Sequence, residues 1–365
     1  MNRLAVILVA VVVLLLVACE GKEPLYQEQG YVFGTLVEIS VYGESEKTAR
    51  QAVSEVMQEF QRLHTMLHAW QPSELSDLNA AFASKQSVAI SAELSAILQD
   101  ATMLSQQSQG LFNPAIGGLV QLWGFHADEF KSVQPDEKQI AQWVAANPRM
   151  SDITIINGRA QSNNKFVQVD LGGYAKGYAL DRAAELMHKH GIHNALINIG
   201  GNILALGQHG KRAWRVGIQH PRKPGPLATL ELHDGEAIGT SGDYQRYFTV
   251  GTKRFCHLID PNNGYPMQGV QSVTVLIKPL AIRLGEQTTP AKSLVMTRGV
   301  HAGVLSDVAS KPLFIAGVQG WRDAASQMNV SAAMLVDGQG NVQLTSELQK
   351  RLEFTDNSLR PQVEL

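Results

Sequence analysis

The sequence predicts an α+β fold: a single bilobal domain of mixed and antiparallel sheets with packed helices. Helical and strand patterns follow one another without the regular alternation of a doubly wound parallel sheet. Several strands are joined by tight turns, such as Asn157-Gly158 and Gly251-Thr252. Residues 31–352 contain no linker or shift in composition, so we expect one domain there rather than two.

The composition is that of a large globular protein with almost balanced charge. The chain has 365 residues, and 44% are hydrophobic, which is enough for a sizeable core. Lys and Arg number 31 against 33 Asp and Glu, giving a formal net charge of -2. Because there is no basic surplus for a phosphate backbone, no nucleic acid is expected as a partner.

The N-terminal segment is predicted to direct the protein to a membrane. Residues 4–18 form an unbroken apolar run that is too short for a stable spanning helix. The run ends in Leu16-Val17-Ala18-Cys19, which resembles a bacterial lipoprotein signal cleaved before Cys19. We expect residues 1–18 to be the signal peptide and Cys19 to carry the lipid. Residues 19–30 would then tether the domain on the periplasmic side of a bacterial membrane; an ordinary signal peptide or an uncleaved anchor is the alternative.

Hydrophobic periodicity predicts the elements of the domain in order. A strand at residues 31–42 precedes amphipathic helices at 46–67, 91–108 and 135–147 and a hairpin at 153–169. Further strands are predicted at residues 195–199, 214–219, 228–232, 237–244, 247–250, 253–260, 270–277, 332–336 and 342–344. A late helix starts at Ala302 and is expected to break at Pro312. Residues 278–301 carry few periodic signals, and residues 353–365 are predicted to be a tail.

The segment around which the chain is organised is residues 169–177, Val-Asp-Leu-Gly-Gly-Tyr-Ala-Lys-Gly. Phe166, Val167 and Val169 predict a strand, which ends at Asp170 before two glycines and a helix. A glycine pair at a helix start exposes backbone N–H groups and suits a phosphate or diphosphate. The spacing is not G-x-G-x-x-G, so a Rossmann-type site is not supported. A tight turn with a glycine needed for helix packing is an equally good interpretation.

Several segments together resemble one family, the FAD:protein FMN transferases, or ApbE-like flavin transferases. They come in the family's order and span nearly the whole chain after residue 30. The matching segments are Phe33-Gly34-Thr35, residues 70–79, 110–114, 122–125, 170–181, 198–202, 241–248, 257–261 and 264–266, and a weaker match at Ser306-Asp307.

The resemblance implies an activity. Such enzymes bind FAD and a divalent metal, here Mg²⁺, and transfer FMN to a threonine hydroxyl of a target protein. The product is a phosphoester-linked flavin, and AMP is released. The usual targets are subunits of Na⁺- or ion-translocating flavin reductases. The chemistry needs a cation at the diphosphate and a base near the incoming hydroxyl.

The resemblance also assigns roles to residues of this sequence. His257 stands at the position of the catalytic base, and the Gly173 carbonyl and Asp307 stand at metal-ligand positions. On the residues alone, His257 could equally be a strand histidine and Asp307 a solvated helix residue. The positions that the resemblance assigns to FAD binding are Phe33, Trp70, Leu111, Phe112, Asn113, Asp170, Lys176 and Ile259.

The sequence departs from the family pattern at one metal position. The family has a second metal ligand, a threonine, four residues after the metal-binding aspartate, and Lys311 stands there in this chain. A charged lysine only donates hydrogen bonds and cannot coordinate a cation. Either the metal is held by fewer protein groups, or Lys311 itself brings positive charge to the diphosphate. Two other functions stay open: hydrolysis of FAD to FMN and AMP, and a non-catalytic FAD-binding lipoprotein, which Lys311 favours.

Overall fold

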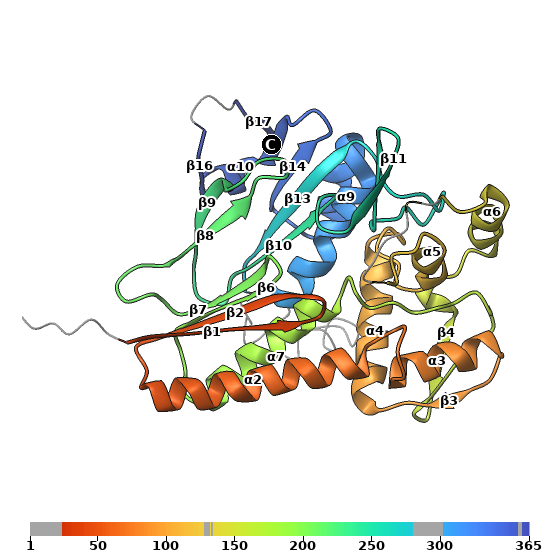
Figure 1. Cartoon of the computed structure of the whole chain (residues 1–365), viewed down its shortest axis with the longest axis horizontal. Coiled ribbons are helices and arrows are strands. Elements are labelled where there is room, and N and C mark those ends of the chain that lie inside the picture. The colour runs from red at the N-terminus through yellow and green to blue at the C-terminus, as the bar shows by residue number, and fades with distance from the viewer. Residues whose placement is uncertain (1–23, 128–131, 133, 280–301, 357–359, 365) are drawn as a thin grey trace, which may run out of the picture.

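A nine-stranded sheet forms the centre of the molecule (Figure 1). The computed structural model describes residues 24–127, 132, 134–279, 302–356 and 360–364. Neighbouring strands run antiparallel, except that the last pair is parallel. In spatial order the strands are β1 (Leu25–Val32), β2 (Thr35–Tyr42), β6 (Ala195–Ile199), β7 (Asn202–Leu206), β10 (Ala237–Gly242), β13 (Val270–Ile277), β14 (Ala332–Asp337), β15 (Val342–Thr345) and β17 (Gln362–Glu364).

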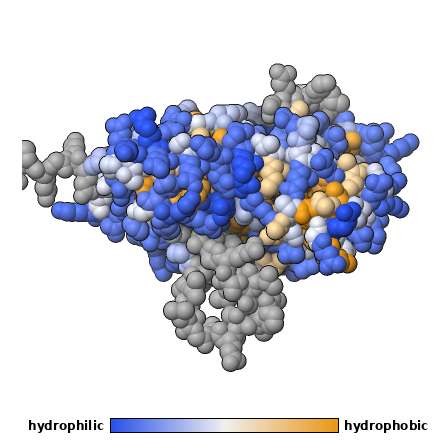
Figure 2. Space-filling view, turned by 90° about the horizontal axis from the view of Figure 1, so that it is seen from below, coloured by the Kyte–Doolittle hydropathy of each residue, from blue (hydrophilic) through white to orange (hydrophobic). Residues whose placement is uncertain are grey.

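One face of this sheet packs on three long helices: α2 (Glu46–Met66), α7 (Ala175–Lys189) and α9 (Ala302–Gln327). The predicted helix at 46–67 is confirmed, because its apolar residues recur every three or four positions and are buried. Its polar residues face solvent, and Figure 2 shows that this side of the molecule is largely hydrophilic, with hydrophobic residues gathered toward one end. Among the described residues no helix has the length and apolarity needed to cross a membrane.

The other face of the sheet is covered by a second sheet of three strands, in the order β16 (Leu352–Phe354), β9 (Pro226–Leu232) and β8 (Trp214–Gln219). Strands β13 and β14 are therefore buried along their whole length. Burial on both faces explains why the sequence of β14 reads as a nearly continuous apolar run rather than as an alternating pattern.

A smaller lobe lies at one end of the molecule, at the right of Figure 1. Its own buried cluster includes Trp123, Phe248 and Phe255, and the Trp123 indole donates to the Gly264 carbonyl at 2.8 Å. The predicted α+β class with a bilobal single domain is confirmed. The elements of this lobe are α3 (Glu74–Ala83), α4 (Ala92–Gln107), α5 (Gly117–Leu122), α6 (Glu137–Ala146), η1 (Met150–Asp152), β3 (Val88–Ala89), β4 (Ile153–Ile156), β5 (Arg159–Ser162), β11 (Tyr247–Val250) and β12 (Lys253–Cys256).

Both predicted terminal segments are partly wrong. Residues 25–30 belong to β1, which pairs with β2 along its whole length, and are not a tether. In the predicted tail, β16 pairs with β9, and β17 pairs with β15; a short helix, α10 (Ser346–Gln349), comes before them. These segments are polar or very short, and pairing with another strand, the adjacent β2 in the case of β1, makes them strands. The predicted signal peptide and Cys19 lie outside the described residues.

Two local predictions are also wrong. Residues 166–169 make a single bridge, Ile116 to Gln168, instead of a regular strand. Helix α9 continues through Pro312 and is interrupted at Gly317, whose φ of 69° no helix allows. A proline is tolerated where the lost hydrogen bond is offset by packing, and the left-handed backbone of Gly317 makes the actual kink. The weakly patterned residues 280–301 are outside the described part of the chain.

Helices α7 and α9 approach so closely that both need glycine at the contact. A Cβ added at Gly177 would lie 2.7 Å from the Cα of Val304 and 2.8 Å from the Cβ of Asp307. A Cβ added at Gly303 would lie 2.5 Å from the Gly177 carbonyl oxygen. Because these are mostly backbone atoms, a side chain at either position must push the helices apart.

Replacing Gly177 with alanine is therefore expected to lower the free energy of unfolding by about 1–3 kcal/mol, as over-packing does in other cores. Urea unfolding measures this. Gly320→Ala is a matched control in α9, because the nearest atom to its added Cβ is the Cβ of Ala316 at 3.1 Å. If Gly177→Ala lowered the free energy of unfolding no more than Gly320→Ala does, the close contact between α7 and α9 would not require glycine.

Candidate active site

The glycine turn before α7 is held in place by its own carboxylate. The Asp170 backbone N–H donates to the Pro114 carbonyl at 2.9 Å, and its Oδ1 accepts from the Gly172 N–H at 2.8 Å. Burial raises the pKa of Asp170, while the Gly172 N–H and the positive charge of Arg246 act in the opposite direction. The turn therefore presents a partly desolvated carboxylate next to the start of a helix.

Asp307 of α9 closes the first turn of α7. Its Oδ2 accepts from the Gly177 N–H at 3.0 Å, and the N-cap residue of the helix, Tyr174, makes no side-chain cap. A carboxylate at a helix N-terminus is favoured by the helix dipole. Burial alone would raise the pKa of Asp307, but the charges of Lys311 and Lys176 lower it overall.

Lys311 lies one helical turn after Asp307 and contacts it twice. Its Nζ is 2.6 Å from Asp307 Oδ1 and 2.6 Å from the Asp307 carbonyl oxygen. The Asp307 side chain is 1% exposed and that of Lys311 is 14% exposed. Burial lowers the pKa of Lys311 and the charge of Asp307 opposes this, so the two form a desolvated ion pair.

The structure brings the three predicted metal-site residues together. A Cβ added at Gly173 would lie 2.7 Å from Lys311 Cε and 2.9 Å from its Cδ, so the lysine stem passes directly over this glycine. The Phe112 ring lies on the same side, with its Cε2 3.7 Å from that position. Gly173, Phe112, Lys311 and Asp307 are thus neighbours, although 199 positions separate the two ends of the set along the chain (112 to 311).

This arrangement does not fit a divalent cation. Both carboxylate oxygens of Asp307 are engaged, one by an ammonium and one by a backbone N–H. Mg²⁺ prefers octahedral coordination by oxygen ligands, and an ammonium offers none. Over the described ranges, no group of three or more His, Cys, Asp or Glu side chains could hold a metal ion.

His257 lies directly after β12 and is half-buried. Its backbone N–H donates to the Arg246 carbonyl at 3.1 Å, and its Nδ1 lies 3.3 Å from the same oxygen. A carbonyl only accepts, so Nδ1 carries the proton and Nε2 keeps a lone pair. Burial, followed by the charges of Arg246 and Lys176, lowers the pKa of His257 to about 3. The imidazole is therefore neutral and can accept a proton.

Three cations act electrostatically on this histidine. Arg246, Lys176 and Lys311 each lower the pKa of His257, so their charges lie within electrostatic reach of it. Arg246 also donates to the Phe125 carbonyl at 2.7 Å, and its charge acts to lower the pKa of Asp170. The sequence-based assignment missed Arg246. It lies in the matching segment 241–248, and that segment was the only signal that could have indicated it.

Trp70 joins the same site through Asp170. Its side chain lies near enough to that carboxylate to lower the pKa of Asp170, and its backbone N–H donates to His68 Nδ1 at 3.1 Å. Phe33 connects less directly: its ring is 5.7 Å from the ring of His64, which is 5.3 Å from the ring of His68. Phe33 lies in the β1–β2 turn with a φ of 56°.

The side chains of Asn113 and Ile259 are engaged within the protein. The Asn113 amide donates to the Pro148 carbonyl at 2.9 Å, and its oxygen accepts from the Ala115 N–H at 3.1 Å, so it shapes its own loop. Ile259 is buried in the small-lobe cluster. Leu111 is half-buried beside Phe112. These three residues can support the site, whereas Phe112 touches it.

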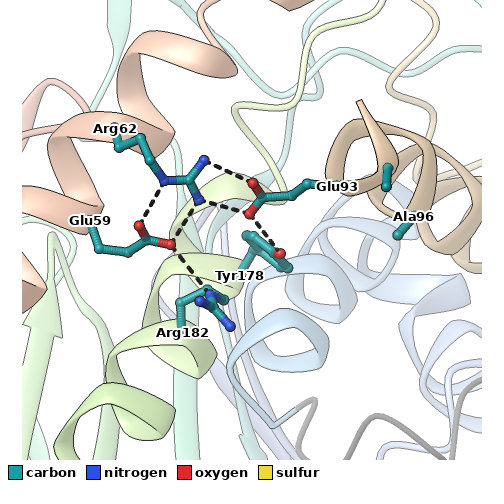
Figure 3. Close-up of a pocket in the computed structure, with 7 residues that line it drawn as sticks. Glu59, Arg62, Glu93, Ala96, Tyr178 and Arg182 are labelled. Atoms are coloured by element: carbon teal, nitrogen blue, oxygen red, sulfur yellow. Dashed lines mark hydrogen bonds and ion pairs between the residues drawn. The ribbon is translucent and has the colours of Figure 1, made fainter. Parts of the chain in front are cut away.

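A cavity of about 430 Å³ lies elsewhere, between α2, α4 and α7 (Figure 3). Its charged residues pair with one another. Arg62 binds both Glu59 and Glu93, Arg182 also contacts Glu59, and the Tyr178 hydroxyl donates to Glu93 at 3.1 Å. Because these charges are mutually satisfied, the cavity is a weaker candidate than the cluster around His257.

Comparison with known proteins agrees with the fold and with the motifs. The sequence model described as the ApbE family matches residues 33–290. A Rhodobacter capsulatus protein named FAD:protein FMN transferase is 40% identical over 333 residues, which is 91% of this chain and 59% of that protein. One of the same name from Haemophilus influenzae is 30% identical over 283 residues, or 74% of this chain and 81% of that protein.

Solved structures show the same fold. The ApbE protein of Thermotoga maritima superimposes with a TM-score of 0.77 at 25% identity, covering 90% of this chain and 99% of that one. The family match spans more than half of the chain, and the Haemophilus relative is covered over more than two thirds of its length. The resemblance inferred from the motifs is thereby confirmed, and the chain belongs to the ApbE family.

Proposed function

We propose that this chain is an FAD:protein FMN transferase. The relatives that carry this name support the assignment. In the reaction, the hydroxyl oxygen of an acceptor threonine attacks the phosphorus atom on the riboflavin side of the FAD diphosphate. A new phosphoester bond forms, the bond from that phosphorus to the bridging oxygen breaks, and AMP leaves with the bridging oxygen.

The observation that carries this function is a neutral histidine among cations. The Arg246 contact uses Nδ1 of His257, and the lowered pKa keeps the imidazole neutral, so the Nε2 lone pair is available for the proton of the incoming hydroxyl. Arg246, Lys176 and Lys311 supply positive charge of the kind that a diphosphate and its developing negative charge need. The N-terminus of α7 adds a dipole of the same sign.

The target and the location are part of the proposal. We infer that the acceptor is a flavoprotein subunit of an ion-translocating reductase with an exposed threonine, as the family resemblance suggests. The sequence Leu16-Val17-Ala18-Cys19 supports a lipid on Cys19, which would hold the enzyme on the periplasmic side of a membrane. Labelling cells with a lipid precursor, with Cys19→Ser as control, tests the anchor.

The function is tested with the full chain, FAD and a purified candidate acceptor. Covalent transfer is expected to give a fluorescent acceptor band that survives denaturation and a mass increase of one phosphoester-linked FMN. The matched control is the acceptor with its threonine replaced by valine, which keeps the shape and removes the hydroxyl. Equal labelling of the valine acceptor, or none of the threonine acceptor, would count against the function.

A further inference from the structure

The ion pair between Lys311 and Asp307 has a consequence for the role of metal. A diphosphate that is being cleaved needs positive charge beside it, which divalent cations often supply. In this chain, the Asp307 carboxylate beside the first turn of α7 already holds an ammonium, with Lys311 Nζ 2.6 Å from Oδ1. A metal ion binding the same oxygen would sit in contact with a like charge.

We propose that the Lys311 ammonium takes the place of a divalent cation, so that the chain binds the FAD diphosphate without added metal. The inference rests on the proposed function. It decides between the two interpretations of Lys311 that the sequence left open. The cation is part of the fold, because the same helix supplies the lysine and its carboxylate partner one turn apart.

The geometry allows this role. An ammonium has three N–H donors, and the contacts in the described part of the chain use two of them, both on Asp307. The third can donate to a phosphate oxygen. The lysine stem lies over Gly173, where any side chain would collide with it, so the ammonium is held beside the start of α7.

The neighbouring charges favour an anionic ligand. The positive charge of Lys176 acts to lower the pKa of Lys311, of Asp307 and of His257. Two ammonium groups within electrostatic reach of each other repel, and an anion bound between them relieves the repulsion. The carboxylate of Asp307 offsets only one of these charges. A diphosphate is the part of FAD with the matching chemistry.

The first measurement uses the wild-type full chain and needs no variant. FAD binding is titrated by flavin fluorescence in excess EDTA and then in Mg²⁺. Coupled ligands typically change each other's affinity about 5–150-fold, so a metal-independent site should show a change below about fivefold. FAD affinity that rises more than this with Mg²⁺ would overturn the inference and leave the proposed function standing. No FAD binding in either condition would overturn both.

Two substitutions separate charge from coordination. Lys311→Thr removes the ammonium and offers a hydroxyl oxygen next to the released carboxylate. Its FAD affinity in EDTA should fall about 10–100-fold, the usual value of a charged hydrogen bond, and should recover in Mg²⁺. Lys311→Met should lose as much FAD affinity in EDTA and should not regain it in Mg²⁺. Lys138→Thr, at an exposed position in α6, should leave the FAD affinity unchanged in both conditions.

Direct metal binding gives an independent readout. Mn²⁺ binding, followed by electron paramagnetic resonance without FAD, should be absent in the wild type and present in Lys311→Thr. Thermal unfolding of each variant shows whether it is folded before it is scored. Mn²⁺ binding to the wild type at the affinity of the threonine variant would contradict the replacement of metal by Lys311.

Discussion

Replacing His257 with glutamine is expected to slow FMN transfer about 10²–10⁴-fold, the usual contribution of a general base, and to leave FAD binding close to that of the wild type. The reason is that Nδ1 is committed to the Arg246 carbonyl, so Nε2 is the atom left to accept the threonine proton. Glutamine keeps the approximate size of the side chain but cannot take up a proton. Single-turnover transfer and an FAD titration measure the two effects separately.

The pH dependence of the wild type checks the same group. The pKa of His257 is lowered from 6.5 to about 3, so the imidazole stays neutral when the pH falls from 8 to 5. We expect the acid side of the rate profile to lie well below the pKa of an ordinary histidine, about 6.5. His193→Gln, an exposed histidine, is the control and should retain full activity. Loss of activity with a midpoint near 6.5, or full activity of His257→Gln, would rule out this base.

Replacing Asp307 with leucine is expected to lower the free energy of unfolding by about 3–5 kcal/mol, because it leaves the Lys311 ammonium buried without its partner. It also removes the acceptor of the Gly177 N–H at the start of α7. The folded-state pKa of Asp307 is lowered, so its stabilisation is present above its ordinary pKa and is lost as the pH falls through the lowered value. Urea unfolding at neutral and acid pH measures both effects.

Two comparisons show whether the buried pair is the cause. In Asp307→Leu with Lys311→Met, both charges are gone, and we expect most of the lost stability to return, since apolar replacement of a whole buried pair is often nearly neutral. Glu46→Gln breaks the exposed pair with Arg50 and should cost no more than about 1 kcal/mol. If the double variant were as unstable as Asp307→Leu alone, the buried ammonium would not explain the loss.

Local sequence patterns predicted the elements that depend on local interactions. The helix at 46–67 has enough apolar residues at helical spacing to be recognised alone, and the Asn157-Gly158 turn joins β4 to β5 as expected. Strands β1, β16 and β17 were missed, because their sequences are polar or only three residues long. Pairing with another strand decided these segments, with the adjacent β2 for β1 and with β9 and β15 for the other two, and periodicity carries no information about such pairing.

At the site, too, sequence motifs predicted some features, and contacts between distant segments decided the others. The family motifs pointed to His257, Asp170 and Asp307, and the structure places these residues in one region around the start of α7. The i, i+4 spacing of Asp307 and Lys311 allows a contact, but a lysine on a helix usually turns to solvent. It is buried here because Gly173, far away in the sequence, leaves room for its stem. Arg246 was missed because its position depends on the loop carbonyl of Phe125.

The most direct test of FMN transfer is the ratio of AMP released to flavin bound covalently to the acceptor. In a reaction with FAD, the full chain and a threonine-bearing acceptor, the proposed transfer predicts equal amounts of AMP and protein-bound FMN, and only background AMP when the acceptor is left out. AMP that appears together with free FMN and an unlabelled acceptor would contradict transfer and indicate hydrolysis. FAD that binds but never yields AMP would contradict any catalytic role.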